Sequence, residues 1–164
     1  MKLVFETKEA KMWFDSEYNI FKVKWIGVVS YNTFRGLILC GRDILEHLEY
    51  AHFLFDRREL DSFSAEARVW LKYDFMKRGG DGRRLIKRIR RIAAIKSPSI
   101  IGQIAASVFS KIFVFFNPKL TYRTFSDDIS AECWVKGIPL LEDMALQAPR
   151  SERKGNFLTR LFGV

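Results

Sequence analysis

Hydrophobic positions along this 164-residue chain follow two different spacings, which alternate from one segment to the next. A spacing of two is typical of a half-buried strand, and a spacing of three to four is typical of a helix with one buried face. Lys11–Asp15 and Ile20–Trp25 have the first pattern and are joined by turn-forming residues, which predicts a β-hairpin. Leu3–Glu6 predicts an edge strand beside it.

A helix is predicted directly after this hairpin. Ser30 can cap it, because a serine oxygen accepts a backbone N–H at a helix start. The apolar stripe that follows spans roughly five turns. It consists of Phe34, Leu37, Ile38, Gly41, Ile44, Leu45 and Leu48.

Strands and helices are predicted to alternate through the rest of the chain. The strands are His52–Phe55, Arg90–Ile95 and Thr121–Phe125, and the helices are Ala65–Lys77, one that opens at Ser99, and a short one capped by Ser126. The expected inner faces of the first two helices are Ala65, Val69, Trp70, Tyr73 and Met76, and then Ile100, Ile101, Ile104, Ala105, Val108 and Phe109. Gly79–Gly82 is expected to stop a helix.

One segment of this alternation allows two interpretations. Leu85–Ala93 also fits helical spacing, but Lys96-Ser97-Pro98 favours a strand that ends at Ile95. The alternation predicts an α/β fold, with a mixed sheet of four to five strands and helices packed on it. One domain is expected over residues 1–138, with a partly flexible extension over 139–164 whose role stays open.

Composition and targeting signals favour a cytoplasmic protein. Two cysteines without a CxxC spacing are typical of a reducing compartment. Glu6 interrupts the N-terminal apolar residues, which excludes a signal peptide there. Polar residues also interrupt Ser99–Phe116, so this segment does not predict a membrane span.

The positive charge of the chain is concentrated in one segment. The net charge is +9, and Lys77–Lys96 holds nine basic residues and one acid, 9 − 1 = +8. This segment is either a solvated charged face or an anion-binding surface for membrane lipids or nucleic acid. No stacking aromatics interleave it, which makes nucleic acid the less favoured partner. The candidate anion-binding residues are Arg83, Arg84, Lys87, Arg88, Arg90 and Arg91.

Several segments together resemble small bacterial STAS-like proteins, which are related to the SpoIIAA-like anti-sigma-factor antagonists. These segments are the hairpin over Lys11–Ile26, Phe55–Leu60 after a buried strand, Arg91–Ile95, and Thr124–Trp134, which combines a strand end, an acidic cap and an Ala-x-x-Trp helix. The resemblance covers roughly Glu9–Val135 and contains no catalytic signature. It implies a mixed sheet with helices and a role in regulatory binding.

The same resemblance draws attention to Ser62. Phospho-switched members carry an Asp-Ser pair at the start of the helix after the central strand, and Asp61-Ser62 lies in about that place. The glycine that normally follows is absent. A phosphate on Ser62 would add negative charge near Arg57 and Arg58, whereas the simpler interpretation is that Ser62 or Ser64 caps the second helix.

No catalytic or metal-binding constellation is apparent. His47 and His52 lack the spacing of two ligands on one helix face, and neither Cys40 nor Cys133 has an evident base. We therefore expect a non-enzymatic regulatory or binding domain without a cofactor. Its partner would be a protein, a second copy or a small apolar ligand. The alternative is a peripheral protein that binds anionic membrane or nucleic acid through residues 77–96.

Overall fold

The computed structural model describes residues 1–77 and 80–139, without the side chains of residues 101, 105, 106, 108 and 109. Most of the proposed C-terminal extension lies outside these residues, as do Arg78 and Gly79. The strands are β1 (Lys2–Glu6), β2 (Ala10–Asp15), β3 (Ile20–Val29), β4 (Ala51–Phe63), β5 (Ile89–Ile95) and β6 (Thr121–Phe125). The helices are α1 (Tyr31–Leu45), α2 (Ala65–Trp70), α3 (Asp81–Ile86), α4 (Ile100–Phe116) and α5 (Asp128–Lys136). A π-helical turn, η1 (Leu71–Phe75), continues α2.

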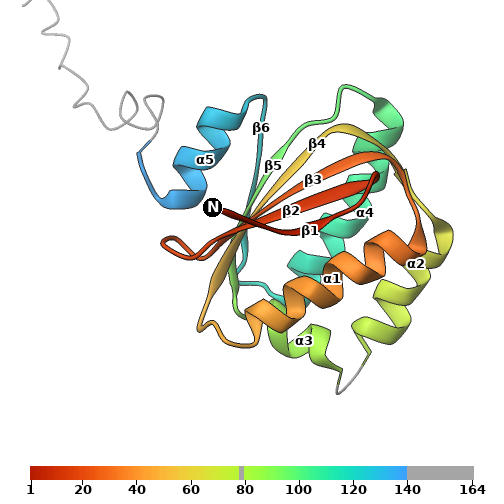
Figure 1. The fold of residues 1–164 in the computed structure, drawn as a ribbon, viewed down its shortest axis with the longest axis horizontal. Coiled ribbons are helices and arrows are strands. Elements are labelled where there is room, and N and C mark those ends of the chain that lie inside the picture. Colours follow the sequence, from red (N-terminus) through yellow and green to blue (C-terminus); the bar gives the residue numbers. More distant parts are fainter. Residues whose placement is uncertain (78–79, 140–164) are drawn as a thin grey trace, which may run out of the picture.

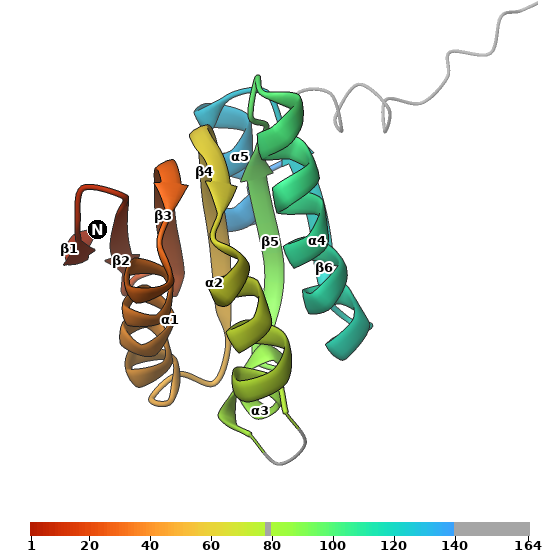
Figure 2. The same cartoon turned by 90° about the vertical axis from the view of Figure 1, so that its right-hand side faces the viewer.

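The strands form one mixed sheet in their sequence order. β1, β2 and β3 pair antiparallel, while β3 through β6 pair parallel. Helices α1 to α4 cover one face of the sheet and α5 lies alone on the other (Figures 1 and 2). The predicted α/β class with a mixed sheet is confirmed, with six strands in the described part of the chain rather than four to five.

Two cores form because successive strand residues point to opposite faces of the sheet. Phe53 and Phe55 of β4 pack into the larger core under α1 to α4. Leu54, between them, belongs to the smaller core under α5. The two faces of β4 therefore carry different chemistry, which matters for the charged residues that follow.

The central strand is much longer than the sequence predicts. The apolar run ends at Phe55, but β4 continues to Phe63 through charged residues. It continues because β3 extends to Val29 and pairs with it in parallel, up to Val29 opposite Phe63. The prediction that this strand ends at Phe55 is therefore wrong.

Two helices present faces different from those expected. Val69 and Tyr73 were predicted to be internal but are 55% and 62% exposed. Met76 is buried as predicted, but Ala67 and Leu71 are buried in place of Val69 and Tyr73. The π-helical turn then spaces the buried Leu71 and Met76 five residues apart. In α4, Ile100 and Ile104 are exposed and Ile112, Phe113 and Phe116 pack on the core.

The predicted caps are correct at one helix and wrong at another. The Ser30 side chain accepts from the Thr33 backbone N–H, as expected. Asp127, rather than Ser126, caps α5 through the Ser130 N–H at 2.8 Å.

The glycine segment after η1 has a second role besides ending a helix. Gly80 is the N-cap of α3, a helix that the sequence did not predict. Gly82 lies in α3 so close to Phe75 that a Cβ there would overlap its backbone carbonyl. A glycine is therefore needed for this close packing.

Candidate functional site

An aromatic pocket lies between the sheet and helices α1 and α4. Its cavity volume is about 50 Å³, so the pocket is narrow. Its lining is apolar except for one arginine, two hydroxyls and the Trp25 indole N–H, and consists of Trp25, Phe34, Ile38, Phe55, Arg57, Phe63, Ser110, Phe113 and Tyr122. We call it the Arg57 pocket. A few polar groups in an apolar concave site are typical of a small-molecule site.

Three aromatic rings form one wall of this pocket. Trp25 of β3 stacks on Phe34 of α1 with ring centroids 5.9 Å apart. Phe63 meets both rings edge-on, at 5.2 Å and 5.5 Å. Such contacts fix ring positions beyond simple burial. The wall is therefore preformed.

Arg57 is the charged group of the pocket. Its side chain shares the helix-covered face with Phe53 and Phe55 because all three occupy alternate positions of β4. It is only 9% exposed, and its Nε donates to the Ile95 carbonyl at 3.3 Å. Its terminal nitrogens have no hydrogen bond or carboxylate partner within residues 1–77 and 80–139. These nitrogens face the pocket and retain some solvent contact there, so they are available to a ligand.

A β-bulge places this arginine. Lys24 pairs with Asp56 and Ile26 with Glu59, so two residues of β4 oppose Trp25 alone. A bulge bends the strand and redirects side chains, and is frequent next to functional sites. The β4–β5 ladder also ends at Asp56, which frees the Ile95 carbonyl for the Arg57 Nε.

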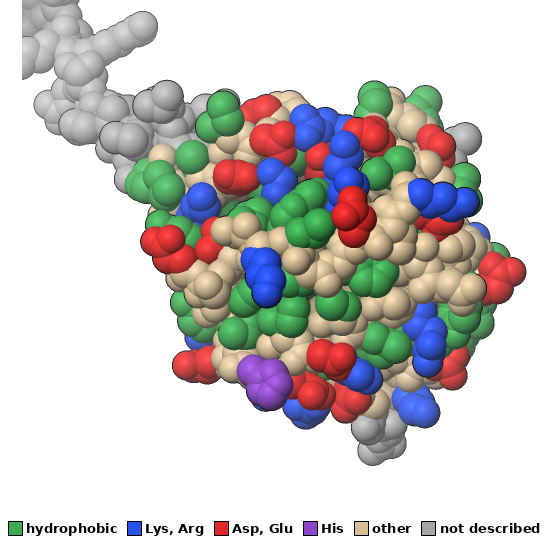
Figure 3. Space-filling model, in the orientation of Figure 1, with side chains coloured by type: hydrophobic (Ala, Val, Ile, Leu, Met, Phe, Trp, Pro, Cys, Tyr) green, Lys and Arg blue, Asp and Glu red, His purple; other side chains and the backbone are tan. Residues whose placement is uncertain are grey.

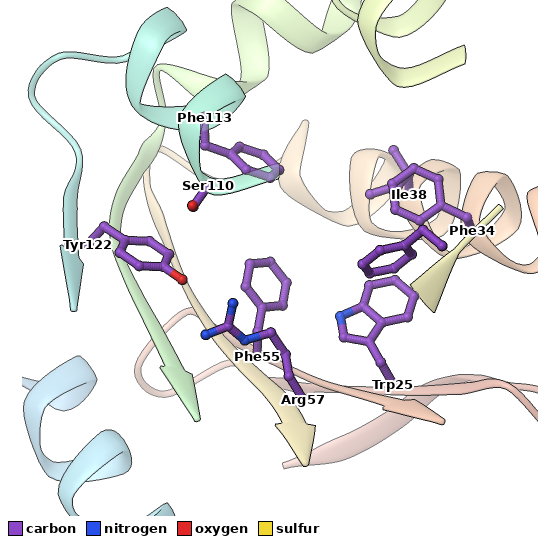
Figure 4. Close-up of a pocket in the computed structure, with 9 residues that line it drawn as sticks. Trp25, Phe34, Ile38, Phe55, Arg57, Ser110, Phe113 and Tyr122 are labelled. Carbon is purple, nitrogen blue, oxygen red and sulfur yellow. The ribbon is translucent and has the colours of Figure 1, made fainter. Parts of the chain in front are cut away.

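The polar atoms gather on one side of the pocket. Figure 4 shows the Arg57 guanidinium and the Tyr122 hydroxyl on one side, with Trp25, Phe34 and Ile38 on the other. The Tyr122 hydroxyl has no hydrogen-bond partner in the described part of the chain. The Ser110 hydroxyl donates to the Ser107 carbonyl and keeps its acceptor capacity.

Apolar space continues beyond the pocket. A second cavity of about 60 Å³ shares Ile38, Phe55 and Phe113 with the first. We call it the inner chamber; it extends to Met12 under α1 and to Leu85 of α3. On the outside, a shallow groove along α4 shares Ser110 and Tyr122 with the pocket. The two cavities together offer a polar end and a long apolar interior.

An ion-pair network lies on the opposite face of the sheet. Arg58 contacts both carboxylate oxygens of buried Asp56, at 3.0 and 2.7 Å, and Asp128 of α5 at 2.6 Å. Burial acts to raise the pKa of Asp56, but hydrogen bonds from Arg58 and its positive charge outweigh it, so the pKa lies below its ordinary value. Lys22 forms a further ion pair with Glu132 of α5, with 2.9 Å between Nζ and Oε1. This network attaches α5 to the sheet.

Three of the six anion-binding candidates are occupied by structural contacts. Arg83 donates to the Met76 carbonyl, and Arg84 pairs with Glu46 at 3.0 Å. Arg88 donates to three carbonyls at the end of α1. Lys87, Arg90 and Arg91 instead line one cleft. Sequence reasoning missed that Lys119 and Lys136 join them, because they are distant in sequence.

Ser62 lies within β4, opposite Val28 of β3, and not at a helix start. The cap of α2 is Ser64, whose Oγ accepts from the Ala67 N–H at 3.2 Å. An extended strand rises about 3.3 Å per residue, so Ser62 lies too far along it to act through Arg57 or Arg58. That part of the reasoning is wrong. Phosphorylation of Ser62 stays a prediction.

The remaining chemistry-bearing residues form no reactive group in the described residues. No cluster of three potential metal ligands occurs there. Burial, with a smaller contribution from Asp43, raises the pKa of the Cys40 thiol, which disfavours the reactive thiolate. No helix in the described ranges is long and apolar enough to span a membrane.

Comparisons with known proteins identify the fold. No family model and no curated protein matches the chain. A crystal structure of an uncharacterised DUF3478-family protein with a SpoIIAA-like fold, from Shewanella loihica PV-4, is similar with a TM-score of 0.52 and 16% identity. The match covers 80% of this chain and 97% of that one. The fold is therefore SpoIIAA-like, as the sequence resemblance implied.

Proposed function

We propose that this protein is a non-enzymatic binding domain for a small apolar ligand that carries one negatively charged group. The observation that supports this best is Arg57, a buried cation without a charged partner in the described residues, at the polar end of an apolar pocket. A carboxylate is the simplest group that completes its hydrogen bonding, because a guanidinium binds carboxylates in a bidentate manner.

The rest of the site fits a ligand of this type. The Tyr122 hydroxyl can donate to the same anionic group, and the apolar lining continues into the inner chamber, whose side chains must move apart to admit an apolar chain. Burial of apolar surface contributes about 25 cal/mol per Å². The charge therefore orients the ligand and the chain supplies affinity. A medium-chain fatty acid has the required chemistry.

The test compares decanoate with decanol, its uncharged counterpart, by isothermal titration calorimetry. We expect decanoate to bind wild-type protein, and Arg57→Met to weaken binding at least about tenfold, since a charge-assisted hydrogen bond contributes about 1.5–3 kcal/mol. Arg68→Met, on the exposed surface of α2, is the control and should bind like wild type. Equal affinity for decanoate and decanol, or an unchanged Arg57→Met, would refute the proposal.

A protein partner is a second candidate, supported by the outer face of α4. Ile100, Ile104 and Phe115 are 75%, 62% and 77% exposed and follow helical spacing on this face. We infer that this face contacts a second copy of the chain. Light scattering should then show a dimer that Phe115→Asp converts to monomer. A wild-type monomer at high concentration would contradict self-association.

A further inference from the structure

A basic cleft lies on the α5 side of the sheet, at the amino ends of the parallel strands. Its volume is about 570 Å³. The lining contains five cations, Lys87, Arg90, Arg91, Lys119 and Lys136, together with His52 of β4, and it contains no acidic residue. Acidic and basic side chains are intermixed on the face drawn in Figure 3, whereas all charged residues that line the cleft are basic. The cleft is thus a local concentration of positive charge.

Local backbone structure brings these cations together. Ala51 pairs with Ile89 and His52 with Arg91, so Arg90 is an extra, unpaired residue of β5. This bulge lets neighbouring arginines reach the same cleft, although strand neighbours ordinarily point to opposite faces. The Arg90 guanidinium lies over the Tyr50 ring, 4.3 Å from its centroid.

Buried Asn117 fixes the position of Lys119 next to these arginines. Its Nδ2 donates to the Ile86 and Ile89 carbonyls at 2.9 and 2.8 Å, and its Oδ1 accepts from the Lys119 N–H at 3.2 Å. It is 6% exposed. The loop that carries Lys119 is therefore attached to the start of β5.

The end of α5 completes the cleft. The Arg91 Nη1 donates to the Trp134 carbonyl at 3.1 Å. Gly137, with φ of +79°, ends the helix, and a Cβ there would lie 3.0 Å from the same nitrogen. Gly137 thus leaves room for the guanidinium.

The cations of the cleft lack balancing charges. Within the described ranges, Lys87, Arg90, Arg91 and Lys119 have no carboxylate partner, and Lys136 has only Glu132 at 4.0 Å. Like charges held together repel one another unless an anion joins them. A single carboxylate would leave most of this charge uncompensated, whereas a phosphate ester or diphosphate matches it better.

We propose that the basic cleft is a binding site for a phosphate group, presented either by a small soluble phosphate compound or by a lipid headgroup. This site lies on the opposite face of the sheet from the Arg57 pocket and does not depend on the function proposed for that pocket.

His52 provides a local reporter of binding. Burial, then Arg91 and Arg90, lower its pKa to about 4, and its Nδ1 is buried without a hydrogen-bond partner in the described residues. Tyr50, Lys87, Lys119 and Lys136 also line the cleft around it. A bound phosphate offsets the positive charges, so the His52 pKa should rise. His47, the other histidine, lies outside this cleft and serves as the internal control.

The experiment titrates the two imidazoles by NMR in the full chain, without and with pyrophosphate. We expect pyrophosphate to raise the His52 pKa by about one unit or more, as a nearby anion does, whereas the His47 resonances should not respond to pyrophosphate. The variant Arg90→Gln/Lys119→Gln should weaken pyrophosphate binding at least about tenfold, given the worth of two charge-assisted contacts. Arg84→Gln/Lys111→Gln removes the same charge outside the cleft and should bind like wild type.

Further arms separate the possible sources of the phosphate. Flotation with vesicles of phosphatidic acid, compared with phosphatidylcholine, tests a lipid headgroup. Response to pyrophosphate supports a soluble compound, and cleft-dependent binding to phosphatidic acid alone supports the headgroup. Absence of both, binding only to a single-stranded oligonucleotide, or equal losses in both double variants would overturn the proposal.

Discussion

Replacing Arg57 should make the ligand-free protein more stable, although it removes the charge on which binding depends. Arg57→Met keeps a side chain of similar length and removes a guanidinium that is 9% exposed and has one hydrogen bond, to the Ile95 carbonyl. Full burial of a charge without a partner costs several kcal/mol, and the solvent contact that the terminal nitrogens of Arg57 retain reduces this to about 3 kcal/mol. The lost hydrogen bond contributes only about 1 kcal/mol.

The net expectation for Arg57→Met is therefore a gain of about 2 kcal/mol in the free energy of unfolding, from these opposing contributions. For a chain of this length, that gain raises Tm by about 4–8 °C. Urea denaturation followed by circular dichroism measures the free energy directly, and an unchanged m-value shows that the same transition is compared.

Arg68→Met on the exposed side of α2 is the matched control, and it should change the free energy of unfolding by no more than about 0.5 kcal/mol. A loss of about 1 kcal/mol or more in Arg57→Met would refute the reasoning, because it would mean that the folded protein stabilises this charge. Added decanoate should narrow the difference in stability between the two proteins, since ligand binding stabilises the wild-type protein more than Arg57→Met.

Three further predictions concern stability. Asp56→Asn removes the carboxylate that Arg58 contacts, and should lower the free energy of unfolding by about 2 kcal/mol, as measured by urea denaturation at pH 7. An unchanged free energy of unfolding would show that the ion pair does not stabilise the fold. His52 has a pKa of about 4, so the unfolded chain binds its proton first as pH falls from about 6.5, and stability should decline over that window. His52→Gln should show a smaller decline there, and an equal decline would contradict the assignment. Gly82→Ala should cost about 1–3 kcal/mol through overlap with a backbone carbonyl, while Gly41→Ala, with ordinary contacts in α1, should not destabilise; equal effects would argue against this packing.

Residue spacing predicted those parts of the fold in which local pattern and tertiary environment agree. α1 follows Ser30 and buries Phe34 and Leu37, as its 3–4 spacing indicates. The strand ending at Ile95 was also predicted, against a competing helical pattern. In both segments the apolar side chains alone determine which face is buried.

The pattern failed where a neighbouring element or a backbone irregularity determined the outcome. β4 runs through charged residues because β3 supplies a parallel partner up to Phe63. The π-helical turn places the buried Leu71 and Met76 five residues apart, a spacing that a regular helical period cannot anticipate. Neither feature has a local sequence signal.

Both candidate sites depend on the same property of a strand, which sends neighbouring residues to opposite faces. Asp56 and Arg57 are adjacent, yet Asp56 is paired on the α5 face and Arg57 lies in the aromatic pocket on the other. Read as a sequence, Asp56-Arg57-Arg58-Glu59 is a balanced, solvated run in which each charge has a neighbour of opposite sign. Folding separates these charges, and Arg57 alone loses its neighbours while it becomes buried. Searching sequences for charge clusters cannot find such a residue. A charged position on the apolar face of a long parallel strand is the feature that would identify it.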